Sequence, residues 1–158
     1  MSLRIALLTA LAGNLAVGAE PERFHLEGTA RQIDTVTTKL SLAGGRERQF
    51  GAEPRFGAYR TAGETVTTVN ETRIAGTIRC TAWDAQGEDI NLQGICEVAE
   101  GPDRWSMTYS CNMKGAPEPE GWCWGQTVGM AGRYDGRRGS FTWRAAGGRL
   151  VGEGVWRN

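Results

Sequence analysis

The fold is decided by residues 74–123, which read IAGTIRCTAWDAQGEDINLQGICEVAEGPDRWSMTYSCNMKGAPEPEGWC. They hold all four cysteines of the chain, and three runs within them alternate small or apolar residues with polar ones. A period of two is typical of a β-strand that buries one face. The most regular run places on one face Trp105, Met107, Tyr109, Cys111 and Met113. We therefore predict three consecutive antiparallel strands.

Polar turns separate these runs. Residues 84–89 read DAQGED and residues 100–103 read EGPD, and both contain the glycine that a tight turn favours. When each hairpin is folded about its turn, neighbouring cysteines come close enough across adjacent strands for a disulfide. The stretch therefore predicts a meander of β-hairpins cross-linked by disulfide bonds.

Four cysteines allow three disulfide connectivities. We favour Cys80–Cys96 with Cys111–Cys123, because these pairs close the shortest loops that do not overlap, and the other two pairings stay open. The alternative to disulfide formation is that the four cysteines bind zinc. The sequence has no C-x-x-C pair and its single histidine is remote, so we predict no metal site.

The rest of the chain also predicts strands rather than helices. No window carries a helical apolar stripe, and turn signals recur about every ten residues, which is typical of a β-sandwich or barrel. Arg46–Ala62 is rich in Gly, Pro and charge and is expected to be an irregular loop. The further strands are expected at Phe24–Ala30, Ile33–Leu42, Glu64–Glu71, Trp122–Met130, from Phe141 onward, and at Leu150–Trp156.

Residues 1–19 predict a secretory signal peptide. Arg4 supplies the positive start, Ile5–Val17 is an apolar core too short to span a bilayer, and Val17–Ala19 offers small residues for cleavage. Residues 20–158 are then a single domain, with no further run long enough to span a membrane. A secreted or periplasmic location agrees with the cysteines, which need an oxidising compartment to pair.

The charge of the domain is nearly balanced. Arg4 is the only charged residue of the first 19, so residues 20–158 carry 17 basic and 18 acidic side chains and a net charge of −1. This balance argues against a general nucleic-acid or membrane-surface binder.

Two glycine-spaced motifs resemble those of small bacterial exported barrels that are similar to the allene oxide cyclase and dirigent barrels. They are Trp83-Asp84-x-x-Gly87-x-Asp89 and Gly132-x-Tyr134-x-Gly136-x-x-Gly139-Ser140-x-x-Trp143. The resemblance covers about residues 76–143 and implies an eight-stranded antiparallel barrel with a central cavity. Plant cyclases of this type hold a reactive fatty-acid-derived epoxide in that cavity. No functional residue of the family finds a matching position here, so none is carried over.

The candidate ligand-lining residues are Trp105, Met107, Tyr109 and Trp143. The first three share the inward face of one strand, and Trp143 is expected to face inward on another. They either line an apolar pocket or fill the core of a small barrel, and the sequence leaves both open. If Cys123 points inward, the flanking Trp122 and Trp124 are exposed and suggest a contact surface.

Catalytic signals are absent from the sequence. His25 lies on the polar face of its strand, and Gly139-Ser140 lacks the second glycine of a nucleophile elbow. The acidic residues within 84–89 could bind calcium, although a solvated turn explains them and no EF-hand loop is present. We predict no cofactor, and the catalytic residues, if any exist, are unknown.

Charge is uneven along the chain. Residues 84–121 carry a net charge of −6 and residues 129–158 a net charge of +4. Complementarity between neighbouring strands is one explanation. The other is an anion-binding patch of arginines, formed by Arg133, Arg137, Arg138 and Arg144.

Three functions remain open. The leading hypothesis is an exported barrel that binds a small apolar or amphipathic molecule in its interior. The alternatives are a cyclase- or isomerase-like enzyme that positions a reactive lipid-like or polyketide-like substrate, and a protein-binding or inhibitor module. The sequence does not decide between enzyme and binder.

Overall fold

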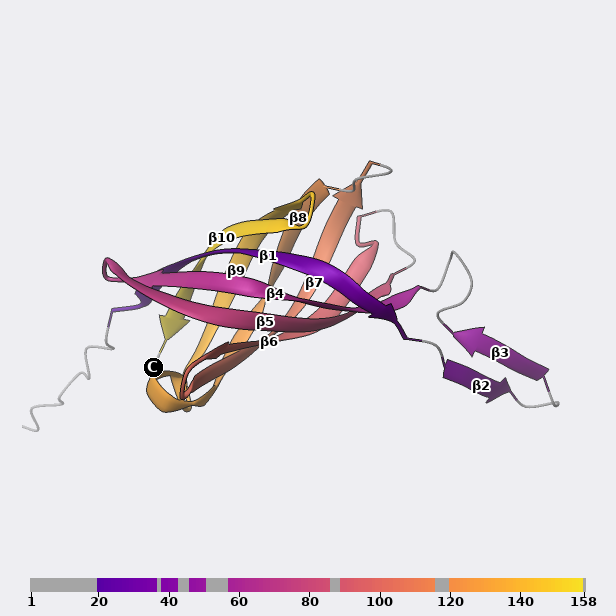
Figure 1. Cartoon of the computed structure of the whole chain (residues 1–158), viewed down its shortest axis with the longest axis horizontal. Helices are drawn as coiled ribbons and strands as arrows, with labels where there is room; N and C mark the ends of the chain where they lie inside the picture. Colours follow the sequence, from indigo (N-terminus) through magenta and orange to yellow (C-terminus); the bar gives the residue numbers. More distant parts are fainter. Residues whose placement is uncertain are drawn as a thin grey trace, which may run out of the picture.

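Eight strands of the chain close into an antiparallel barrel in the computed structural model (Figure 1). The structure describes residues 20–36, 38–42, 46–50, 57–85, 89–115 and 120–157. The barrel strands are β1 (Glu22–Thr35), β4 (Ala58–Val69), β5 (Thr72–Asp84), β6 (Leu92–Glu100), β7 (Asp103–Lys114), β8 (Glu120–Ala131), β9 (Arg138–Ala146) and β10 (Arg149–Arg157). A short 3-10 helix, η1 (Gly132–Tyr134), joins β8 to β9.

The order of the strands is a meander. Around the barrel they run β1-β10-β9-β8-β7-β6-β5-β4, and β1 closes the sheet because it pairs with both β10 and β4. Full closure leaves no barrel strand with an unpaired edge. The predicted all-β, antiparallel, eight-stranded architecture is confirmed.

Two predictions in the N-terminal part of the chain, one of a strand and one of a loop, were wrong. Ile33–Leu42 is not one barrel strand, because β1 continues to Thr35 and β2 (Thr38–Leu42) pairs only with β3 (Arg46–Phe50). This hairpin lies beyond one end of the barrel (Figure 1). The loop predicted for 46–62 contains β3 and the start of β4, while residues 51–56 lie outside the described residues, as does the predicted signal peptide of residues 1–19.

Both disulfides bridge residues that face each other across neighbouring strands. Cys80 and Cys96 are register partners of β5 and β6, and Cys111 and Cys123 are partners of β7 and β8. In each bridge the Cα atoms are 4.0 Å apart. The favoured connectivity is confirmed, and two formed disulfides indicate a non-reducing environment.

The two ends of the barrel differ. We call the end with the β4–β5 and β6–β7 turns the floor, and the opposite end, with the β9–β10 turn, the mouth. Aromatic rings fill the floor, and each of them is no more than 3% exposed: Phe24, Trp105, Tyr134, Phe141 and Trp156. Edge-to-face and offset contacts hold these rings together, as between Trp105 and Trp156, whose centroids are 5.6 Å apart.

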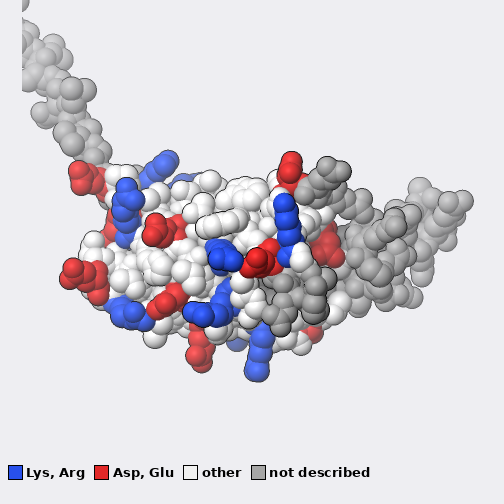
Figure 2. Space-filling view, turned by 90° about the horizontal axis from the view of Figure 1, so that it is seen from above, with Lys and Arg blue, Asp and Glu red and all other residues white. Residues whose placement is uncertain are grey.

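Charged side chains of both signs are scattered over the face shown in Figure 2. Ion pairs join the acidic and basic parts of the chain, including Arg133 with Asp103 and Arg144 with Glu120. These pairs favour complementarity between neighbouring elements over an anion-binding patch of arginines.

Candidate functional site

The candidate site is a cavity of about 460 Å³ in the half of the barrel nearest the mouth. All eight barrel strands contribute to its wall, and the β9–β10 turn at Gly147 and Gly148 marks the end at which it reaches the mouth. Its volume lies in the range of pockets that hold small molecules. Its apolar wall includes Leu92, Met107, Met113, Trp143, Leu150 and the four cysteines of both disulfides.

Three of the four predicted ligand-lining residues lie on this wall: Met107, Tyr109 and Trp143. Trp105 does not. It is fully buried in the floor, one inward position closer to the β6–β7 turn than Met107, and is packed against Phe24 and Trp156. Alternation along β7 gives the face of each residue, whereas the depth at which aromatic packing ends depends on all eight strands.

Tyr59 and Thr61 belong to the wall but were not predicted to do so. Both face inward from the start of β4, a segment whose glycine and charge content indicated an irregular loop. The signal that could have found them is the alternation of Tyr59, Thr61 and Gly63 with Arg60, Ala62 and Glu64, which continues the period of the following residues.

The polar groups of the cavity are mostly uncharged. Burial, together with the nearby charge of Asp84, raises the pKa of Tyr59 to about 12. Burial and the proximity of Tyr59 also raise the pKa of Tyr109. Both phenols therefore keep their protons at neutral pH and can donate hydrogen bonds. Among the described lining residues, Arg149 is the one charged side chain, and it is exposed at the mouth.

A buried polar network lies in the floor and outside the cavity wall. Glu100 is 3% exposed and accepts hydrogen bonds from the hydroxyls of Thr67 and Tyr134, the latter at 2.6 Å. Burial and this contact with Glu100 raise the pKa of Tyr134. Residues 100–103 do form a turn, but Glu100 is buried instead of solvated, so the network is a structural part of the floor.

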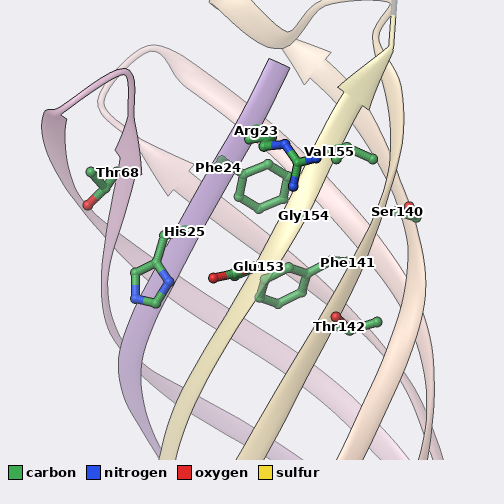
Figure 3. A pocket seen from close by; sticks show the side chains of 10 residues that line it. All are labelled: Arg23, Phe24, His25, Thr68, Ser140, Phe141, Thr142, Glu153, Gly154 and Val155. Carbon is green, nitrogen blue, oxygen red and sulfur yellow. The ribbon is translucent and has the colours of Figure 1, made fainter. Parts of the chain in front are cut away.

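A shallow depression on the outer wall contains the single histidine. Figure 3 shows His25 and Glu153 projecting from neighbouring strands, where they are register partners of β1 and β10. Ser140 also borders the depression, but within the described part of the chain no hydrogen bond joins it to His25 or Glu153. The geometry is that of a solvent-facing strand surface and not of a hydrolytic triad.

The remaining candidate features lie on the surface or outside the described residues. Cys123 is buried, and the side chains of Trp122 and Trp124 are 64% and 42% exposed, as expected for an inward Cys123. Of the acidic cluster at 84–89, residues 86–88 lie outside the described residues, and Asp84 accepts a hydrogen bond from the backbone of Gly57. Within the described ranges no three His, Cys, Asp or Glu side chains come together as a metal site would require.

Comparison of the chain with protein-family models, with curated proteins and with solved structures finds no match. In the part of the chain that the structure describes, no helix is long and apolar enough to cross a membrane.

Proposed function

We propose that the protein is an exported barrel that binds one small apolar or amphipathic molecule in the cavity near its mouth. The observation that carries the proposal is the cavity itself. A barrel of this size can fill its interior with side chains, as the floor of this one does. Here about 460 Å³ stays open behind a wall of Leu, Met, Trp and cystine sulfur.

The chemistry of the wall supports an apolar occupant. Burial of roughly 300 Å² of apolar ligand surface gives about 7.5 kcal/mol before the costs of association are subtracted. This gain sets an upper limit to the affinity near a micromolar dissociation constant. The two disulfides fit a protein that works outside the cytoplasm. The closed eight-stranded barrel also fits the resemblance to the allene oxide cyclase and dirigent barrels, of which the plant cyclases hold a small molecule in the central cavity.

The test is titration with N-phenyl-1-naphthylamine, a neutral dye that fluoresces in apolar surroundings. We expect saturable binding of one dye per chain. Ala145→Phe places a ring in the cavity from the inward face of β9 and should weaken binding about tenfold or more, since overfilling a pocket excludes its ligand. Ala75→Phe makes the same change at an exposed position of β5 and is the matched control.

Thermal unfolding of both variants shows whether each retains the fold. The proposal is rejected if the folded protein does not bind the dye, or if Ala145→Phe binds it as tightly as Ala75→Phe does.

A further inference from the structure

Two tyrosines of the cavity wall lie in one cross-strand row with only small residues between them. In strand register, Tyr59 of β4 faces Ala82 of β5, Ala82 faces Gly94 of β6, and Gly94 faces Tyr109 of β7. All four positions belong to the inward face, and Ala82 and Gly94, which are both buried, carry no side chain larger than a methyl group. Both tyrosines line the cavity, so the row presents two phenol groups to it.

The ring of Tyr109 has a fixed direction within this row. A Cβ atom built on Gly94 would lie 2.5 Å from both Cζ and the hydroxyl oxygen of Tyr109, so the tip of the phenol lies directly over the glycine backbone. On its other side the ring makes an edge contact with Trp143, at 5.2 Å between centroids. The hydroxyl of Tyr109 is thus directed across β6, toward the side of the barrel from which Tyr59 projects.

Both hydroxyls are available for bonding to a ligand. Among the hydrogen bonds of the described residues, none involves the hydroxyl of Tyr59 or of Tyr109. Asp84, whose charge acts on Tyr59, accepts its hydrogen bond from the backbone of Gly57 and does not line the cavity. Since the pKa of each phenol is raised, both remain donors at neutral pH.

We propose that Tyr59 and Tyr109 together hold an uncharged oxygen acceptor of the ligand, so that the cavity selects apolar molecules that carry a carbonyl group. This inference rests on the proposed function and specifies its ligand class. A hydrocarbon would leave two enclosed hydroxyls without partners, which disfavours it relative to a carbonyl compound of equal size.

Charged ligands fit this space less well. A cation would find no carboxylate among the described lining residues. A buried carboxylate would meet two neutral donors only, because Arg149 is exposed at the mouth, and desolvation of an anion costs more than two such bonds return. An uncharged carbonyl oxygen accepts two hydrogen bonds and carries no such cost.

The test compares butyrophenone with n-butylbenzene, two compounds of similar shape that differ in one carbonyl group. Each displaces N-phenyl-1-naphthylamine from the wild-type protein, from Tyr59→Phe, from Tyr109→Phe and from the double variant. We expect each single substitution to weaken butyrophenone about fivefold, the effect of one neutral hydrogen bond, and the double variant to weaken it about 25-fold. The affinity for n-butylbenzene should stay the same or rise.

Tyr134→Phe is the control. Tyr134 is the third tyrosine of the chain and does not line the cavity, so its substitution should leave the affinities for both compounds unchanged. An infrared measurement gives a second readout that a structural role would not move. The carbonyl stretch of bound butyrophenone should lie at a lower frequency than in hexane, and should return toward the hexane value in the double variant.

The two proposals fail in different ways. Binding of both compounds with equal losses in the tyrosine variants, or with an unshifted carbonyl stretch, overturns the carbonyl selection and leaves the proposed function standing. If the dye and both compounds fail to bind the folded protein, the proposed function falls and the carbonyl selection falls with it.

Discussion

Tyr134→Phe should destabilise the protein far more than the same substitution at Tyr109. Tyr134 is fully buried and donates a 2.6 Å hydrogen bond to the carboxylate of Glu100, which is itself buried. A hydrogen bond to a charged group contributes about 1.5–3 kcal/mol, and a buried acceptor that loses its donor also keeps its desolvation cost. The expected loss in the free energy of unfolding is therefore about 2–3 kcal/mol.

The control isolates the contact from the general effect of removing a phenol oxygen. The hydroxyl of Tyr109 faces the cavity and has no protein partner in the described structure, so Tyr109→Phe should change the free energy of unfolding by less than about 0.5 kcal/mol. The two variants lose the same atom from the same residue type. Any difference between them reports on Glu100.

Urea unfolding at neutral pH with both disulfides intact measures the effect. We expect a lower midpoint with an unchanged m-value for Tyr134→Phe, and a melting temperature that falls by about 5–10 °C. Thr67→Val removes the other donor to Glu100 and, combined with Tyr134→Phe, should give a non-additive loss. If Tyr134→Phe unfolds at the same urea concentration as Tyr109→Phe, the reasoning about the floor network is refuted.

Two further predictions concern the bridges and the cavity tyrosine. Replacing Cys111 and Cys123 with alanine should cost about 3 kcal/mol, the loop-closure value for a separation of 12 residues, measured by urea unfolding; a loss below about 1 kcal/mol would contradict it. Because burial raises the pKa of Tyr59 from 10.0 to about 12, the folded state retains this proton more strongly than the unfolded state, so stability should fall as pH rises from about 10 to 12. The urea midpoint measured across that range should fall less steeply in Tyr59→Phe, and equal slopes would contradict the assignment.

Much of the barrel could be predicted from local pattern. The alternation from Trp105 to Met113 identified the inward face of β7. Turn positions brought neighbouring cysteines together, and the shortest loops that do not overlap favoured the observed disulfides, because period and turn position are properties of short segments. The β2–β3 hairpin was missed because residues 38–50 show no sustained alternation of apolar and polar residues from which two paired strands could be predicted. The Thr and Val content of residues 33–42 indicates extended backbone but not which strand pairs with it.

The site was harder to predict because its boundaries are set across the barrel. Trp105 and Met107 share a face, yet one is packed in the floor and the other lines the cavity. The burial of Glu100 could not be predicted from its polar turn because its partners, Thr67 and Tyr134, are 33 and 34 positions away in the chain. Such separations lie outside any local window, so depth and polar pairing required the three-dimensional structure.

The two halves of the barrel are stabilised by different interactions, and this difference affects which substitutions each half can tolerate. Packed rings determine the shape of the floor, where any altered side chain disturbs its neighbours. Around the cavity, cystine bridges between β5 and β6 and between β7 and β8 keep the wall in place without a filled interior. Substitutions that reshape this half can therefore accumulate with little penalty to folding. Related chains should keep the floor and the cystines, while residues of the cavity wall near the mouth vary more.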